Sequence, residues 1–202
     1  MNFIKKTGFT LIEILVVIAL IGLMYAATSS YTNDSRAYQT NAERLANSIY
    51  DSVRLARNNM IIGRGVFTGG TLLVVNQRTI SLSSQGLKVI YQDVNNNTGT
   101  EVSLQRPFFE GDSNYQIIDI AVSSGGVSTG VVPIWDHTGV TSANVVMNPN
   151  SDIIIDAIKG GVPIPPTTIR TIKLTSGYRG MEQSVVIDRV TGTIEVKKST
   201  ED

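Results

Sequence analysis

Glu13 is the ionisable residue whose position most strongly indicates chemistry. It stands inside a run from Phe9 to Ala27 that is otherwise almost wholly apolar. An acidic side chain near the centre of a membrane helix costs about 2.5–3.5 kcal/mol, so it normally has a partner or a task. The run contains no lysine, arginine or histidine. We therefore expect the partner of Glu13 to come from outside this helix, as a free amino terminus or from another subunit.

The apolar run has the length of one membrane span. At about 1.5 Å per residue it just crosses a hydrocarbon layer of about 30 Å. Lys5 and Lys6 precede it, so the positive-inside rule places the N-terminus in the cytoplasm and the rest outside. An ordinary signal peptide fits poorly, because cleavage after Ala26 would need a small residue where Met24 stands. A plain membrane anchor with an incidental glutamate is a competing interpretation.

The segment from Lys5 to Glu13 resembles the class III leader and processing site of type IV prepilins and pseudopilins. Its sequence is Lys-Lys-Thr-Gly-Phe-Thr-Leu-Ile-Glu. The resemblance implies that a prepilin peptidase cleaves after Gly8 and methylates the new N-terminal residue, Phe9. It also implies that Glu13 is the carboxylate used in assembly.

Cleavage after Gly8 would place a cationic amine on Phe9, about one helical turn from Glu13. A neighbouring subunit, shifted along the fibre axis, could bring its Glu13 to that amine. Such pairing is much stronger in low dielectric than in water, although desolvation offsets a large part of the gain. Because a mispaired subunit would leave a buried charge, we expect this pair to disfavour wrong registers.

Length and composition restrict the remaining possibilities. The 202 residues fit one modest domain with an appendage. The 17 basic and 17 acidic side chains cancel, so no overall charge attracts nucleic acid or anionic lipid. The chain has no cysteine, which excludes disulfides, zinc fingers and cysteine nucleophiles.

An apolar stripe predicts that the helix continues beyond the membrane. Apolar residues recur there at three- and four-residue steps. They are Ala42, Leu45, Ala46, Ile49, Val53, Ala56 and Met60. Gly63 and Gly65 follow as stop signals. The stretch Thr28–Asp34 is rich in Ser, Thr and Asn, and we expect a loosened turn there.

Short β-like runs between turn residues follow Gly65. The predicted strands are Thr71–Asn76, Thr79–Ser83, Leu87–Gln92, Tyr115–Val122, Val131–Trp135, Asn144–Met147, Ile153–Ile155, Thr168–Thr175, Gln183–Asp188 and Thr193–Lys197. A helix followed by antiparallel strands predicts an α+β fold, with the stripe on one face of the sheet. Asp188–Gly192 is expected to turn a closing hairpin, and Gly160–Pro166 to form an exposed loop.

This plan resembles the type IV pilin-like fold, and Ser48–Val66 with the closing hairpin is similar to GspH/FimT-type minor pilins. The resemblance implies a leader at 1–8, a transmembrane and polymerisation helix at 9–27, an amphipathic continuation at 28–65 and a β-rich headpiece at 66–202. The proline often seen near the membrane exit and the C-terminal cysteine pair of many major pilins are missing. Both departures favour a minor pilin or pseudopilin.

One loop has the spacing of calcium ligands. Asp93, Asn95, Asn97 and Glu101 place oxygen atoms on alternate residues around Gly99. The EF-hand pattern is incomplete, because its twelfth position holds leucine. A polar turn between two strands is the favoured interpretation and calcium the alternative; no other cofactor is expected.

Catalysis and nucleic-acid binding have weaker signals. His137 is the chain's one histidine, and no Gly-x-Ser-x-Gly or phosphate-binding glycine loop is present. We therefore expect no enzymatic activity. Basic residues suited to DNA gather in the last third but are interleaved with acidic ones, which favours a solvated mixed-charge face. These candidates are Arg170, Lys173, Arg179, Lys197 and Lys198.

Together these features predict a structural subunit, a minor pilin or pseudopilin, of a type IV pilus or type II secretion pseudopilus. Its expected partners are other pilin or pseudopilin subunits, the prepilin peptidase, the inner-membrane assembly platform and membrane lipid. Before assembly it would span the inner membrane once, with a cytoplasmic N-terminus and an extracytoplasmic headpiece. The alternatives are a DNA-uptake (competence) minor pilin and a membrane-anchored binding domain that never polymerises.

Overall fold

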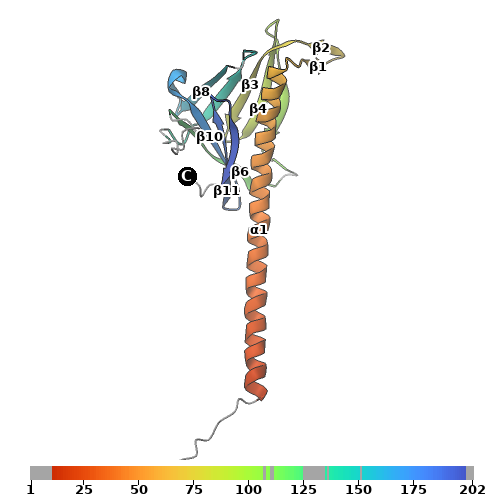
Figure 1. The fold of residues 1–202 in the computed structure, drawn as a ribbon, viewed down its shortest axis with the longest axis vertical. Coiled ribbons are helices and arrows are strands. Elements are labelled where there is room, and N and C mark those ends of the chain that lie inside the picture. The colour runs from red at the N-terminus through yellow and green to blue at the C-terminus, as the bar shows by residue number, and fades with distance from the viewer. Residues whose placement is uncertain are drawn as a thin grey trace, which may run out of the picture. The chain divides into compact units, whose positions relative to one another are not determined.

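The computed structural model of the chain describes residues 11–106, 108–109, 112–124, 135, 137–150 and 152–198, without the side chains of 29–33. The chain forms two compact units, Met1–Tyr38 and Gln39–Asp202. A helix contributes to both units, and all the strands belong to the second (Figure 1).

The helix α1 extends from Leu11 to Ile61 without interruption. The loosened turn expected at Thr28–Asp34 is wrong, because the backbone there is helical. At the start of this stretch the Thr28 hydroxyl donates to the carbonyl oxygens of Met24 and Tyr25, at 2.7 and 3.1 Å. A threonine that bonds back in this way satisfies its hydroxyl inside a helix, so a polar stretch need not end one.

Glycine ends α1 as the sequence predicts. Gly63 has a φ of +64°, the left-handed conformation that glycine adopts at low cost. Its N–H donates to the Met60 carbonyl at 3.2 Å, and the Arg64 N–H donates to the Asn59 carbonyl at 2.8 Å. These two bonds form a Schellman motif, which satisfies carbonyls that the last turn leaves open.

In the part of the chain that the structure describes, the strands form three antiparallel sheets. The first pairs β1 (Val66–Thr68) with β2 (Thr71–Leu73). The second has the order β5 (Thr98–Gln105), β4 (Gly86–Asp93), β3 (Val75–Ser83), β7 (Ser142–Met147), β8 (Ile153–Lys159) and β9 (Val162–Ile164). The third has the order β12 (Ile194–Lys198), β11 (Met181–Asp188), β10 (Thr171–Tyr178) and β6 (Tyr115–Ser123). The predicted α+β class is confirmed.

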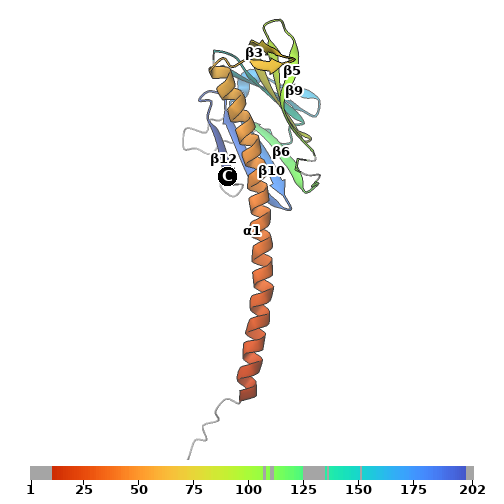
Figure 2. The same cartoon turned by 90° about the vertical axis from the view of Figure 1, so that its right-hand side faces the viewer.

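The apolar stripe of α1 is buried over its whole length. Leu45, Ala46 and Val53 are fully inaccessible, and the other four stripe residues are buried as well. This part of α1 lies along the third sheet (Figure 2). The Arg57 guanidinium fills the space beside Gly192, where an added Cβ would collide with it. The helix therefore supplies one wall of the headpiece core.

Some strand predictions need correction. β1, β5 and the edge strand β9 were not predicted, and the run Thr71–Asn76 is broken at Val74. Gly160–Pro166 is not simply a loop, because Val162–Ile164 pairs with β8 at the edge of the second sheet. Pro163 is tolerated there since an edge strand has one unpaired side. The closing hairpin β11–β12 is confirmed, and residues 131–134 of the expected strand Val131–Trp135 lie outside the described residues.

Candidate processing and assembly site

The first part of α1 carries the candidate membrane span, Leu11–Thr28, with a mean hydropathy of 2.4. Its large apolar side chains from Leu11 to Tyr25 are between 50% and 80% exposed. Fully burying such a side chain is worth about 1.5–3 kcal/mol. A surface of this kind is stable only against lipid or against other apolar helices.

Glu13 lies in the first turn of the described helix, within this apolar segment. Gly8 and Phe9, the residues of the expected cleavage junction, lie outside the described residues. The structure therefore places Glu13, the expected assembly carboxylate, on the apolar helix, while the expected cleavage junction rests on the sequence alone.

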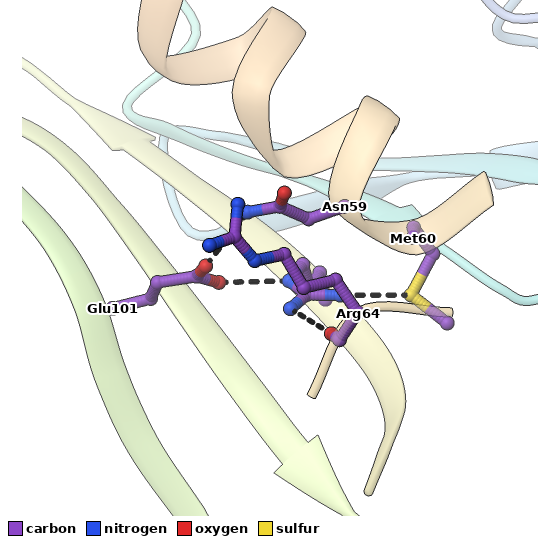
Figure 3. Close-up of polar contacts among 5 residues, drawn as sticks. Asn59, Met60, Arg64 and Glu101 are labelled. Atoms are coloured by element: carbon purple, nitrogen blue, oxygen red, sulfur yellow. Dashed lines mark hydrogen bonds and ion pairs between the residues drawn. The ribbon is translucent and has the colours of Figure 1, made fainter. Parts of the chain in front are cut away.

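A buried ionic network fixes the other end of α1 to the second sheet (Figure 3). Arg78 of β3 is fully buried, and its Nε donates to Glu101 Oε2 of β5 at 2.7 Å. Its Nη2 donates to the Arg64 carbonyl at 2.7 Å, and its Nη1 lies 3.7 Å from the Met60 Sδ. Asn59 of α1 donates from Nδ2 to Glu101 Oε1 at 3.0 Å.

This network was not predicted, although the sequence contains a signal for it. Arg78 alternates in phase with Ile80 and Leu82, so it occupies a core-facing position of an otherwise amphipathic strand. A buried arginine requires an acidic partner. Glu101 supplies that partner from β5, a strand that was not predicted, although a polar turn between two strands was expected just before it.

The four calcium candidates do not converge on one point, because Glu101 leaves the other three. Asp93 accepts the backbone N–H groups of Asn95 and Asn97 at 2.8 Å each, and the Asn97 side chain at 3.0 Å. Glu101 turns instead to Arg78 and Asn59. Asp93, Asn95 and Asn97 thus form a polar turn, and Glu101 belongs to the buried network. Within the described residues, no group of three or more His, Asp or Glu side chains could hold a metal ion.

The turn perturbs the Asp93 carboxyl. The hydrogen bond from the Asn97 side chain, aided by the backbone N–H groups of Asn97 and Asn95, lowers the pKa of Asp93 against an opposing effect of burial. Asn96 has a φ of +66° within this turn, a conformation that asparagine adopts more readily than most residues. The charged form of Asp93 is therefore part of the folded turn.

A second carboxyl supports the aromatic end of the third sheet. The Tyr178 hydroxyl donates to Asp112 Oδ2 at 2.9 Å. The backbone N–H of Asn114 is the main cause that lowers the pKa of Asp112, and the bond to Asp112 raises the pKa of Tyr178. Tyr178 packs on Tyr115 with ring centroids 4.6 Å apart.

The DNA candidates do not form one basic surface. Arg170 and Arg179 flank the 8 residues of β10, so an extended strand at about 3.3 Å per residue places their backbones roughly 30 Å apart. Lys197 and Lys198 are adjacent on β12 and therefore point to opposite faces. Partners also engage these residues: Asp188 lies 3.6 Å from Arg170, Glu195 lies 3.8 Å from Lys197, and the Trp135 ring lies 4.8 Å from the Lys173 amine.

His137 has a structural place. Its backbone N–H and carbonyl pair with Val122 of β6 at 3.2 and 2.9 Å, as an isolated antiparallel bridge. Its side chain is exposed. His137 therefore lies at the edge of the third sheet, beside β6.

Within the described residues, the fold and the site define an α+β protein with one candidate membrane helix near the N-terminus, consistent with the type IV pilin-like fold. Residues 4–28 match the prokaryotic N-terminal methylation motif, which is typical of type IV prepilin-like proteins. The match supports a type IV pilin-like substrate of prepilin peptidase. No curated protein and no solved structure is significantly similar to the chain.

Proposed function

We propose that the chain is a non-enzymatic structural subunit, a GspH/FimT-type minor pilin or pseudopilin, of a type IV pilus or type II secretion pseudopilus. One coincidence carries the proposal. The methylation motif at residues 4–28 overlaps an apolar, exposed helical segment that contains Glu13. An anchor alone would need the apolar surface but neither the motif nor the carboxylate.

The mechanism follows from these residues. The helix enters the inner membrane with its N-terminus in the cytoplasm, and the peptidase cleaves after Gly8. Methylated Phe9 keeps its positive charge, so Glu13 of a neighbouring subunit can pair with it in low dielectric. The exposed apolar side chains then pack against other helices instead of lipid. Extraction into the fibre is the work of an assembly platform and motor that other proteins supply.

Cleavage and assembly can be tested separately in a strain with an active prepilin peptidase. Glu13→Gln keeps the shape of the side chain and removes its charge, so the variant should be cleaved but poorly incorporated into filaments. Glu43→Gln is the matched control, because Glu43 lies on the same helix outside the apolar segment and bonds only to Gln39 among the contacts described, at 3.1 Å. Normal incorporation of Glu13→Gln would refute the charge-pairing mechanism.

A further inference from the structure

The headpiece exposes large apolar side chains around the end of α1 and the β1–β2 hairpin. Ile61 and Ile62 are 51% and 69% exposed, Phe67 and Leu72 are 72% and 65% exposed, and Val74 is 62% exposed. We call these five residues the apolar patch. Exposed apolar groups gathered in this way commonly mark contacts with proteins or membranes.

The hairpin presents two of these side chains outward. Phe67 and Leu72 are directly opposite each other in the β1–β2 pairing, so they share one face. Gly69 and Gly70 turn the hairpin with φ values of +57° and +82°. A Cβ added to either glycine would meet no atom within 4 Å, so the turn lies in open space. The hairpin stands apart from the two larger sheets (Figure 1).

The base of the patch is held in place. The Schellman motif fixes Gly63 and Arg64, and Arg78 binds the Arg64 carbonyl at 2.7 Å. An added Cβ on Gly65 would collide with the Leu73 carbonyl and contact the Leu72 side chain, so the hairpin packs closely on the segment that leads into it. The patch is therefore a presented surface with a defined orientation.

The charge around the patch has a single sign along the sequence. Residues 52–92 contain no Asp or Glu and five cationic residues, Arg54, Arg57, Arg64, Arg78 and Lys88. Glu101 neutralises Arg78 inside the core. Arg54 and Arg64 are exposed. Of the acids in other segments, Asp93 is folded into its turn, and Asp152 lies near Arg57 and Ile61.

We propose that the apolar patch docks onto an anionic lipid surface, with Phe67 and Leu72 in the boundary between headgroups and acyl chains and Arg64 beside lipid phosphates. A projecting, uncharged hairpin suits lipid, which accepts apolar side chains without a complementary groove. The outer edges of β1 and β2 carry backbone groups that cannot enter hydrocarbon unpaired. Docking is thus shallow, about 5–10 Å, as for other interfacial elements. The inference is independent of filament assembly.

The test uses full-length protein in phosphatidylcholine nanodiscs, because the lipid of the disc covers the apolar membrane helix. The discs are mixed with vesicles of phosphatidylcholine with or without phosphatidylglycerol and separated by flotation. We expect flotation with the anionic vesicles, weakened roughly tenfold or more in the double variant Phe67→Ser, Leu72→Ser. Val162→Ser, Val190→Ser is the matched control, since it removes two equally exposed valines elsewhere (67% and 65%) and should float like the wild type.

A second reading detects insertion of the hairpin into the vesicle. A Phe67→Trp variant in phosphatidylcholine discs, mixed with vesicles that contain brominated phosphatidylglycerol, should show quenched emission, whereas the wild type, with Trp135 as its one tryptophan, should not. Unquenched emission from the Phe67→Trp variant together with no flotation would overturn the proposal. Equal flotation with neutral and anionic vesicles would also overturn it, as would patch-dependent pairing of discs without vesicles, which would assign the patch to a protein partner.

Discussion

Replacing Glu101 by glutamine removes the counter-charge of a fully buried arginine while keeping the shape of the side chain. In the wild type, Arg78 is inaccessible and Glu101 is 18% exposed, with 2.7 Å between Nε and Oε2. Loss of one partner of a buried ion pair costs about 3–5 kcal/mol, because the remaining charge is uncompensated. We expect Glu101→Gln to lower the free energy of unfolding by an amount in this range.

The reciprocal variant should be milder. Arg78→Met leaves the carboxylate of Glu101, which still accepts from Asn59 at 3.0 Å and reaches some solvent. It also leaves the Arg64 carbonyl without its arginine donor, which costs about 1–3 kcal/mol. The structure therefore predicts that Glu101→Gln lowers the free energy of unfolding more than Arg78→Met does.

Urea unfolding of the full-length protein in nanodiscs, followed by Trp135 fluorescence, measures both changes. Glu195→Gln is the control, because Glu195 is 41% exposed and pairs with Lys197 at 3.8 Å on the surface. It should change the free energy of unfolding by about 1 kcal/mol or less. A Glu101→Gln protein as stable as this control, or more stable than Arg78→Met, would refute the assignment of a buried charge pair.

Three further predictions concern single turns of the headpiece. Asp93→Asn should make the stability of the protein depend less on pH in acid. The pKa of Asp93 is lowered in the fold, so its carboxylate stabilises the fold above the unfolded pKa, and this effect is lost as pH falls through the folded pKa. An unfolding midpoint that falls equally steeply with acid in both proteins would contradict this. Tyr178→Phe should make the protein less sensitive to alkaline unfolding. The pKa of Tyr178 is raised in the fold, so its neutral hydroxyl stabilises the fold below the unfolded pKa, and this effect is lost as pH rises through the folded pKa. Equal loss of stability with rising pH in both proteins would contradict this. Gly63→Ala should cost about 1–2 kcal/mol, measured by urea unfolding, since φ is +64° there; a neutral result would mean that the helix ends differently.

The features predicted from sequence are those encoded by neighbouring residues. Burial of the stripe from Ala42 to Met60 followed from helical spacing, and the end of α1 followed from Gly63. The break at Val74 and the polar strand β5 were missed, because their pairing depends on strands elsewhere in the chain. β5 has an alternating half-exposed pattern with few apolar residues, so periodicity alone could not separate it from a loop.

The polar sites also divide into those encoded by neighbouring residues, which were predicted, and those that depend on distant strands, which were not. Asp93, Asn95 and Asn97 form a local turn, which the sequence predicted as the favoured interpretation. The ion-pair partner of Glu101 could not be predicted, because Arg78 lies 23 residues away and contacts Glu101 only through the register of β3, β4 and β5. Basic residues that are close in sequence, such as Lys197 and Lys198, separate to opposite faces once a strand forms.

Processing at the junction between Gly8 and Phe9 is the central claim. The most direct test is the intact mass and N-terminal sequence of the protein recovered from membranes with an active prepilin peptidase, with peptidase-deficient membranes as the control. A chain that begins at methylated Phe9 only where the peptidase is active is the predicted result. An intact Met1 start in both membranes would contradict the account and leave a plain membrane anchor.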